Sequence, residues 1–271
     1  MGYKNCYNDA MPYSAFKSEH LQHNLRIVKE LVISDFKLRY QGSYLGYFWT
    51  LIKPLLLFGV IYLVFSFFMP VPVENYAIYL LLGVLIWNFF SEATLIGMNA
   101  FMAKRELVTK IYFSRAALVF ASTISSLITL LLNLVIFFVF LAIAGVAPGW
   151  EALFFFLYLI EMYLIATGVT FALASLTIHF RDLQHIWEIA LQIGFWLTPI
   201  IYPITVVPFE YHSLIFLNPW ARIIEYSRDI FIRHHIPSLY LNLMLLVGTV
   251  VIFALGYAIF KTQENKIAEK L

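Results

Sequence analysis

Chemistry in this chain would have to come from a few polar side chains that interrupt long apolar stretches. Glu92 and Glu161 lie in or at the end of such stretches, where an ionised carboxylate is costly and usually faces protein or water. Together with Asn133 they would suit the coupling of transport to an ion. The alternatives are a structural role for Glu92 near a helix end and a hydrogen bond from a neutral Glu161.

The sequence lacks the residue patterns that a metal site or a nucleotide-binding site requires. His179 and His185 are six residues apart and do not share a helical face, and the single Cys6 excludes a multi-cysteine metal site. None of the 12 glycines begins GxxxxGK[ST], and GxSxG and HExxH are missing. We therefore expect no catalytic site, no metal site and no nucleotide bound by this chain.

Aromatic side chains are abundant, with 26 Phe, 17 Tyr and 6 Trp. Those with a polar tip suit a sugar, which presents C–H faces and hydroxyl edges. Lipid contact and packing are the alternative explanation for most of them. The candidates for a channel wall are Tyr62, Trp87, Tyr158, Tyr163, Trp196 and Tyr202, with Trp49 at the entrance.

The positions of these residues depend on apolar helices long enough to cross a membrane. The chain is 62% hydrophobic and 13% charged, and the 35 residues between Arg115 and Glu151 carry no acidic or basic side chain. A hydrocarbon core about 30 Å thick requires about 20 helical residues. We expect an all-α integral membrane protein with six spans, near 48–69, 76–97, 116–143, 152–178, 186–203 and 239–260.

Basic residues predict the orientation of these spans. Placing both termini in the cytoplasm puts fourteen basic residues inside and only Arg222, Arg228 and Arg233 outside, with Lys53 in the first span. The fourteen are Lys4, Lys17, Arg26, Lys29, Lys37, Arg39, Lys104, Arg105, Lys110, Arg115, Arg181, Lys261, Lys266 and Lys270. A net charge of +2 gives no reason to expect a nucleic-acid partner. Residues 1–46 are too polar to contain a cleavable signal peptide.

Residues 1–46 form a cytoplasmic segment that precedes a transmembrane domain over 47–271. Within 21–40 the apolar side chains recur every three or four residues, which predicts an amphipathic helix at the membrane surface. A small soluble domain is the less favoured alternative, because so short a segment cannot build a core. The residues of the apolar face are Leu21, Leu25, Val28, Val32 and Phe36.

The loop over 98–115 mixes basic and apolar side chains and predicts a short amphipathic helix over about 100–113. Docking on a soluble partner and contact with lipid are equally good explanations from this loop alone. The side chains concerned are Phe101, Lys104, Arg105, Leu107, Val108, Lys110, Ile111 and Tyr112. The next cytoplasmic connection contains the adjacent Arg181 and Asp182, for which a structural role is the default expectation.

Residues 204–238 contain three prolines and no stretch long enough to cross the membrane. Two short helices fit, near 207–216 and 219–232, and we expect them to dip back into the outer leaflet. Glu225 is three residues from both Arg222 and Arg228, beside an apolar stripe that includes Trp220. An outer gate and a passive plug are the two alternatives.

Several segments resemble the permease subunits of ABC-2 type polysaccharide exporters, in the same order along the chain. They are KLRYQGSYLGYFWTLIKP (37–54), LLGVLIWNFF (81–90), LVTKIYFSR (107–115), HFRDLQHIWEIALQIGFWLTPIIYP (179–203) and LNPW (217–220). Each motif alone is weak, and together they are fairly specific for the family that exports O-antigen, capsular polysaccharide or teichoic acid.

The resemblance implies a half-transporter in a bacterial inner membrane. Two copies of the chain would pair around a channel for a lipid-linked polysaccharide, and two copies of a separate subunit would bind ATP and Mg²⁺. It also implies that the loop from Phe101 to Tyr112 is the coupling helix, which favours partner docking. A cytoplasmic gate would comprise Arg39, Tyr40, Trp49, Lys53, Arg181 and Asp182. An extracellular gate would comprise Asn218, Pro219, Trp220 and Glu225.

Two other classes of function stay open. An ion-coupled transporter or channel would use Glu92, Glu161 and Asn133, although the six spans show no inverted repeat. A membrane enzyme acting on a glycosyl lipid is the third possibility. Arg39, Lys53 and Arg115 have two possible roles: contact with a lipid diphosphate, or anchoring to phospholipid, which is favoured.

Overall fold

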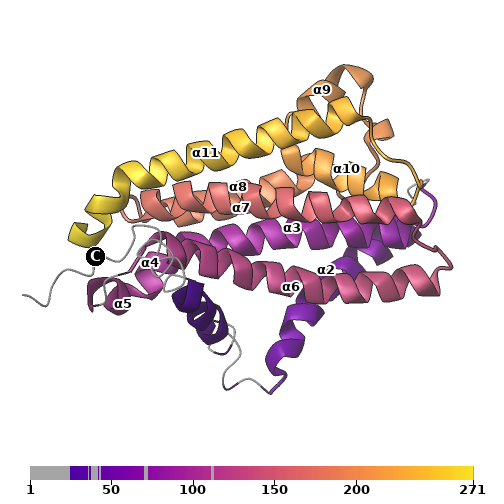
Figure 1. Cartoon of the computed structure of the whole chain (residues 1–271). Coiled ribbons are helices and arrows are strands. Elements are labelled where there is room, and N and C mark those ends of the chain that lie inside the picture. The colour runs from indigo at the N-terminus through magenta and orange to yellow at the C-terminus, as the bar shows by residue number, and fades with distance from the viewer. Residues whose placement is uncertain are drawn as a thin grey trace, which may run out of the picture.

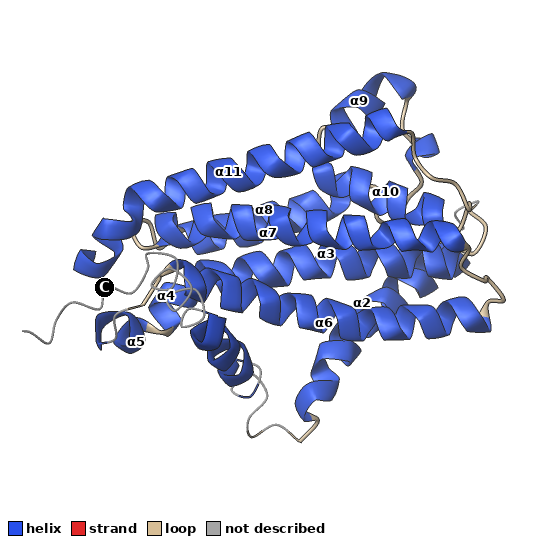
Figure 2. Cartoon of the chain, viewed as in Figure 1, coloured by secondary structure: helices blue, strands red, loops and turns tan. Residues whose placement is uncertain are grey.

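The computed structural model describes residues 25–35, 37, 42, 44–69, 73–110 and 113–270, which form helices joined by loops with no β-strand among them (Figure 2). The longer helices are α2 (Trp49–Leu63), α3 (Tyr76–Met98), α6 (Ala116–Ile143), α7 (Phe155–Thr177), α8 (Leu183–Leu197), α10 (Pro219–Phe231) and α11 (Leu239–Lys270). The shorter ones are η1 (Gly46–Phe48), η2 (Val64–Phe68), α4 (Ala100–Ala103), α5 (Arg105–Lys110), η3 (Trp150–Phe154), η4 (Ile204–Val206), η5 (Phe209–Tyr211) and α9 (His212–Ile215).

Five segments of the described chain are long and apolar enough to cross a membrane. They are Trp49–Phe68, Tyr76–Met98, Ala116–Ile143, Trp150–Thr177 and Leu239–Glu264. These match five of the six predicted spans. Their lengths and apolar composition confirm an all-helical protein built for a membrane.

The sixth predicted span, near 186–203, is not one continuous helix. α8 has 15 residues and ends at Leu197, since Thr198 adopts an extended backbone before Pro199. The residue before a proline is disfavoured in the helical conformation. A helix of 15 residues is about 22 Å long, shorter than a hydrocarbon core.

α3 is the central helix of the bundle. It packs against α2, α6, α7, α8 and α10, and 17 of its 23 residues are buried. A helix that is covered on every side must be apolar all round, which explains the nearly uninterrupted run from Tyr76 to Phe90. Figure 1 shows α3, α6, α7 and α11 running side by side along the molecule.

Among the described helices, α7 and α11 share the most extensive contact. At their crossing, a Cβ atom on Gly256 would overlap the carbonyl oxygen of Gly168. Two facing glycines therefore allow the backbones to touch. At the same interface, Phe253 packs edge-on against Phe171 with ring centroids 6.3 Å apart.

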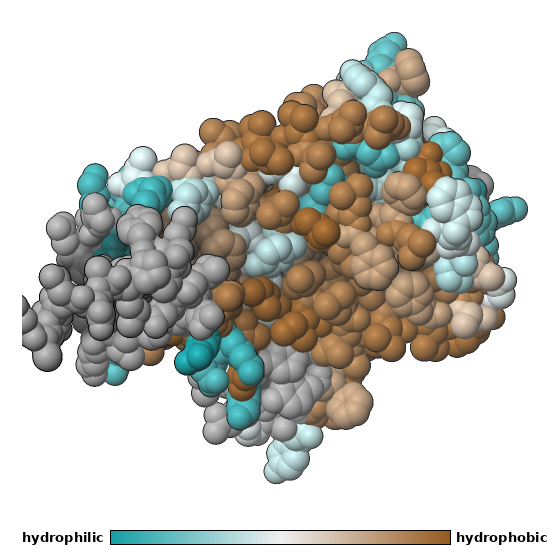
Figure 3. All heavy atoms as spheres, viewed as in Figure 1, coloured by the Kyte–Doolittle hydropathy of each residue, from teal (hydrophilic) through white to brown (hydrophobic). Residues whose placement is uncertain are grey.

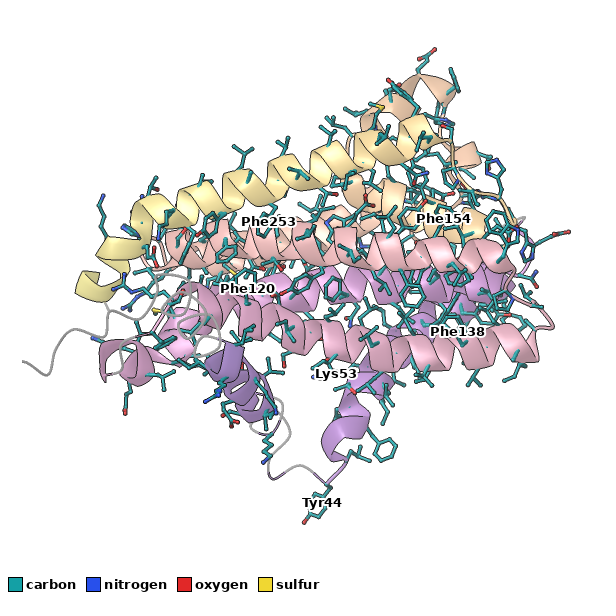
Figure 4. The ribbon with its side chains drawn as sticks, in the orientation of Figure 1. Tyr44, Lys53, Phe120, Phe138, Phe154 and Phe253 are labelled. Carbon is teal, nitrogen blue, oxygen red and sulfur yellow. The ribbon has the colours of Figure 1, made fainter. Side chains whose placement is uncertain are left out.

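α2 is attached to the bundle along one edge. Its buried residues are Thr50, Pro54, Phe58 and Ile61, whereas the opposite face is exposed. The Thr50 carbonyl accepts a hydrogen bond of 3.2 Å from Asn133 on α6. Figure 1 shows the start of α2 leaning away from the other helices, and Tyr44 projects from the loop before it (Figure 4).

The two ends of the bundle differ. α4, α5 and the end of α11 lie together, and α9 and α10 lie toward the opposite end (Figure 1). Apolar side chains cover the middle of the visible face, and hydrophilic side chains gather toward the α9 end (Figure 3). This distribution is typical of a bundle that crosses a bilayer.

The N-terminal amphipathic helix is confirmed over residues 25–35. Its buried residues are Leu31 and Val32, which pack in one cluster with Phe101 and Phe260. Of the predicted apolar face, Val28 and Val32 pack in this cluster and Leu25 is exposed. Leu21 and Phe36 lie outside the described residues.

Candidate functional site

The most elaborate polar arrangement in the described chain lies where α10 packs on α3. α10 begins with Asn218, whose side chain accepts a hydrogen bond of 3.0 Å from the Trp220 backbone, and with Pro219, whose fixed backbone angle suits the first turn. Ten of the 13 residues of α10 are buried. The ring of Trp220 packs against that of Phe90, with centroids 4.4 Å apart. Aromatic packing therefore fixes the first turn of α10 to α3.

Arg228 fixes the third turn of α10. Its side chain is 0% exposed and makes five hydrogen bonds, which is the number of its N–H groups. Nε and Nη2 donate to the Tyr79 carbonyl at 3.2 and 3.1 Å, and Nη1 donates to Glu225 Oε1 at 2.7 Å. The guanidinium carbon also lies 3.4 Å from the centre of the Tyr79 ring. A buried charge is tolerated when it is paired and fully hydrogen-bonded in this way.

The remaining donors of Arg228 hold the irregular segment after α8. Nη1 donates to the Pro199 carbonyl at 2.6 Å, and Nη2 donates to the Ile200 carbonyl at 2.7 Å. The Tyr76 hydroxyl donates to the next carbonyl, of Ile201, at 3.0 Å.

Tyr79 completes this set of contacts. Its hydroxyl lies 3.2 Å from the Tyr202 carbonyl and 3.1 Å from Glu225 Oε1. Arg228 and Tyr76 thus satisfy three consecutive carbonyls, from Pro199 to Ile201, and the single Tyr79 O–H is shared between the Tyr202 carbonyl and Glu225, so a non-helical backbone can be buried here. Tyr76, Tyr79, Glu225 and Arg228 form what we call the α10 clamp.

Gly83 is part of the same geometry. A Cβ atom at this position would lie 2.8 Å from Arg228 Nη2 and 3.2 Å from Ile200 Cγ2. α3 therefore carries a glycine one turn after Tyr79 because the guanidinium occupies that space.

Two further charges flank the clamp at the end of α10. Arg233, with a side chain 48% exposed, lies 2.5 Å from Asp229 and 3.5 Å from Glu225. Burial raises the pKa of the Asp229 carboxyl, and the hydrogen bond from Arg233 opposes that rise. Arg233 makes no hydrogen bond to α3 among those found in the described chain.

The predicted extracellular gate residues come together in this region. Asn218, Pro219, Trp220 and Glu225 all lie on or before α10, and Asn218 also donates to the Thr198 hydroxyl at 3.0 Å. Arg228, Tyr76 and Tyr79 were not among the predicted site residues. The spacing of Glu225 and Arg228, one helical turn apart in an apolar stripe, was the available signal.

The predicted docking loop is two short helices, not one. α4 and α5 are separated at Lys104, which forms an ion pair with Asp35 of the N-terminal helix. Arg105 is exposed. Ile111 and Tyr112 lie outside the described residues, as does the side chain of Lys110.

The expected contact of Phe101 with a partner is wrong. Its side chain is 0% exposed and stacks on Phe260, with centroids 6.2 Å apart. Leu107 and Val108 are half-buried, and Leu107 lines a cavity of about 450 Å³ with Arg26, Glu30 and Phe113. The apolar face of the loop therefore packs on its own chain, and Met102, Ala103 and Arg105 face outward.

The predicted cytoplasmic gate residues do not form one cluster in the described chain. Lys53, Arg181 and Asp182 are exposed, and Trp49 is partly exposed. Arg39 and Tyr40 lie outside the described residues. Figure 4 shows Lys53 on α2, on the side of the molecule where α2 departs from the bundle.

The candidate channel aromatics are also dispersed. Tyr158 is fully buried and donates to Asn242 Oδ1 at 2.8 Å, whereas Trp196 is exposed. Tyr62 stacks between Phe58 and Tyr76, and Tyr163 and Tyr202 are partly buried.

Only Trp87 among these aromatics reaches a described cavity. This pocket measures about 340 Å³, and Phe90, Trp187 and Trp220 also line it. Trp187 donates to the Thr94 hydroxyl at 2.9 Å. The predicted single aromatic wall is therefore not found in one copy of the described chain.

Glu161 and Asn133 are both buried. Both oxygens of Glu161, which is 1% exposed, lack a hydrogen-bond partner within the described residues. Asn133 donates to the carbonyls of Thr50 and Thr129. Glu92 is partly buried and has an interaction of its own. The described residues contain no group of three or more His, Cys, Asp or Glu that could hold a metal ion.

Known proteins resemble this chain over most of its length. The ABC-2 type transporter family matches residues 27–232. O-antigen export system permease protein RfbA of Myxococcus xanthus is 29% identical over 243 residues, which cover 89% of this chain and 94% of the relative. The protein of the same name from Klebsiella pneumoniae is 26% identical, covering 93% and 98%. Polysialic acid transport protein KpsM of Escherichia coli is 22% identical, covering 88% and 93%.

These matches agree with the long apolar helices. An integral membrane protein is the only class that accounts for both. The chain belongs to the ABC-2 type transporter family of membrane proteins.

Proposed function

We propose that this chain is the permease subunit of an ATP-driven exporter that moves a lipid-linked polysaccharide across a bacterial inner membrane. The observation that carries the proposal is the similarity to O-antigen export permeases along nearly the whole chain. Capsular polysaccharide and teichoic acid are alternative cargoes for the same mechanism. Because the sequence has no nucleotide-binding motif, ATP and Mg²⁺ would be bound by a separate subunit.

The proposed assembly has two copies of the chain and two copies of the ATP-binding subunit. Both termini lie in the cytoplasm, and α8 with the segment up to Pro203 makes a sixth crossing. α9 and α10 then lie on the outer side and fold back toward the bundle. The α10 clamp supports this arrangement, because it provides hydrogen-bond donors for the backbone carbonyls of the non-helical segment in the sixth crossing.

The surface for the ATP-binding subunit is the outward side of α4 and α5. Met102 is 39% exposed there, and Ala103 and Arg105 are exposed beside it. The inner side is tied to the bundle by Phe101 and by the ion pair of Lys104 with Asp35. A force on the outward side would therefore reach the bundle through packed contacts.

The first test replaces the docking surface. Met102→Asp with Ala103→Asp places two carboxylates on the outward side and should reduce copurification of the ATP-binding subunit by at least about tenfold, because buried interface positions do not tolerate unpaired charge. Phe209→Asp, on the exposed η5 at the other end, is the matched control and should leave copurification unchanged.

Membrane insertion of each variant is checked by its yield in washed membranes. Copurification of the double variant at the wild-type level would show that the subunit docks elsewhere. Phe101→Asp is not a suitable variant, since Phe101 is buried in its own chain.

The unpaired carboxyl of Glu161 favours a second candidate, an ion-coupled transporter. Transport of a lipid-linked polysaccharide in reconstituted vesicles separates the two. The exporter requires ATP and continues when ionophores abolish ion gradients. An ion-coupled transporter requires a gradient and no ATP.

A further inference from the structure

α3 connects the proposed docking surface with the α10 clamp. Its last residue, Met98, is separated from α4 by Asn99 alone, and its first residue, Tyr76, belongs to the clamp. α3 is covered by helices on all sides. A buried, packed helix moves as a unit, since a close-packed interior does not deform gradually.

α10 touches α3 at two places two turns apart. Trp220 packs on Phe90, and Arg228 binds the carbonyl and ring of Tyr79. The aromatic contact fixes α10 only, because Trp220 makes none of the hydrogen bonds to the four carbonyls from Pro199 to Tyr202. Arg228, on α10, binds both α3 and this segment through five hydrogen bonds, whereas Tyr79, on α3, has one hydroxyl to share between Glu225 and the Tyr202 carbonyl.

We propose that Arg228 is a positioning residue for export, which makes the outer part of α3, α10 and the segment Pro199–Tyr202 move as one body. The inference rests on the proposed function, because it assigns the movement to an ATP-driven cycle. A displacement of α4 and α5 is transmitted along α3 to Tyr79, and through Arg228 to the two elements at the exit. Without Arg228 the ATP-binding subunit still hydrolyses ATP, but α10 and the segment Pro199–Tyr202 no longer move with α3.

The variant that tests this removes the connection and leaves no buried charge. Glu225→Gln with Arg228→Met keeps similar volumes and leaves no lone buried charge, and it removes the donors to the Pro199 and Ile200 carbonyls. Arg233→Met is the matched control, because Arg233 lies just beyond the end of α10, pairs with Glu225 and Asp229, and donates no hydrogen bond to α3 within the described part of the chain.

The first measurement is polysaccharide exported per ATP hydrolysed, with the assembled exporter in vesicles. We expect the double variant to keep ATP hydrolysis within about twofold of wild type and to lose at least about tenfold in export, whereas Arg233→Met keeps both. An unchanged ratio of export to hydrolysis in the double variant would overturn the proposal. A parallel loss of both activities would overturn it as well.

The second measurement needs no transport. Hydrogen exchange of backbone amides in residues 200–207 should accelerate at least about tenfold in the double variant, with amides of α7 and α11 unchanged. Unchanged exchange in 200–207 would contradict the claim that Arg228 holds this segment to α3 and α10. A wild-type assembly that exports nothing with ATP refutes the proposed function, and the exchange result still decides whether Arg228 joins the three elements.

Gly83→Ala is a second route to the same test if the double variant does not fold. Its methyl group would lie 2.8 Å from Arg228 Nη2 and displaces the guanidinium without changing any charge. We expect the same direction of change, with a lower ratio of export to hydrolysis and faster exchange in 200–207. Wild-type values of both would overturn the proposal.

Discussion

Arg228 brings a charge into the interior of an apolar bundle, and its neighbours explain how. Each of its N–H groups reaches an acceptor, and one of those acceptors is the carboxylate of Glu225. Of the other acceptors, the Pro199 and Ile200 carbonyls lie in a non-helical segment and would have no partner in an apolar environment, whereas the Tyr79 carbonyl lies within α3. The arginine and the irregular segment therefore stabilise each other, because the guanidinium supplies N–H donors and the segment supplies carbonyl acceptors.

Removing one member of the ion pair should cost more than removing both. Arg228→Met leaves the Glu225 carboxylate buried with only the half-exposed Arg233 nearby, and we expect a loss of about 3–5 kcal/mol. Glu225→Gln with Arg228→Met should lose less, because no charge is left alone. Apparent melting temperatures in detergent, measured by tryptophan fluorescence, compare the two. A double variant less stable than the single one would contradict this view of the pair.

For single residues, the sequence indicates which side chains are important better than it indicates which residues they contact. It singled out Glu225 by its spacing to two arginines, yet it treated Arg228 as a surface charge that marks the outer side. It also assigned Phe101 to a partner, whereas Phe101 packs on Phe260. Periodicity shows that a side chain lies on an apolar face, and it does not show which of several apolar surfaces covers that face.

At the scale of elements, most helix boundaries follow from local signals. The predicted spans 76–97 and 116–143 agree with α3 and α6 to within one residue, because charges and glycines punctuate the chain there. α11 continues to Lys270, ten residues beyond the predicted end, and Lys261 pairs with Glu264 in that extension. The prediction of a sixth span as one helix was wrong because apolar composition masked the effect of Pro199.

The close crossing of α7 and α11 predicts that a larger residue at Gly256 destabilises the protein. Gly256→Ala should separate the two helices, because the new methyl group would overlap the Gly168 carbonyl, and we expect a loss of about 1–3 kcal/mol. Gly248→Ala on the same helix is the control, since a Cβ atom there has no neighbour within 4 Å. Melting in detergent measures both. Equal stabilities of the two variants would show that the crossing adjusts without cost.

For the whole molecule, the arrangement in the membrane depends on whether α8 crosses. If it does, Phe180 and Phe209 lie on opposite sides. In a Cys6→Ser background we expect Phe209→Cys to react with an impermeant maleimide in intact cells whose outer membrane has been removed, and Phe180→Cys to react only after permeabilisation. Phe209 is 86% exposed and Phe180 is 70% exposed, so access across the bilayer decides which cysteine reacts.

Trp150→Cys is the reference for this experiment, because Trp150 is exposed and precedes α7 on the proposed outer side. Reaction of Phe209→Cys only after permeabilisation, alongside a reactive Trp150→Cys, would mean five crossings. That result would also place the C-terminus outside.

The clamp joins residues made early in synthesis to residues made late. Tyr79 and Arg228 are 149 positions apart in the chain. At about 5–20 residues per second, a ribosome needs about 7–30 s between the two. During that interval the hydroxyls of Tyr76 and Tyr79 must be shielded by lipid headgroups, water or the insertion machinery. The helix that ends up most enclosed therefore stays incompletely covered while more than half of the chain is made, and a nascent chain stopped before residue 228 leaves it unfinished.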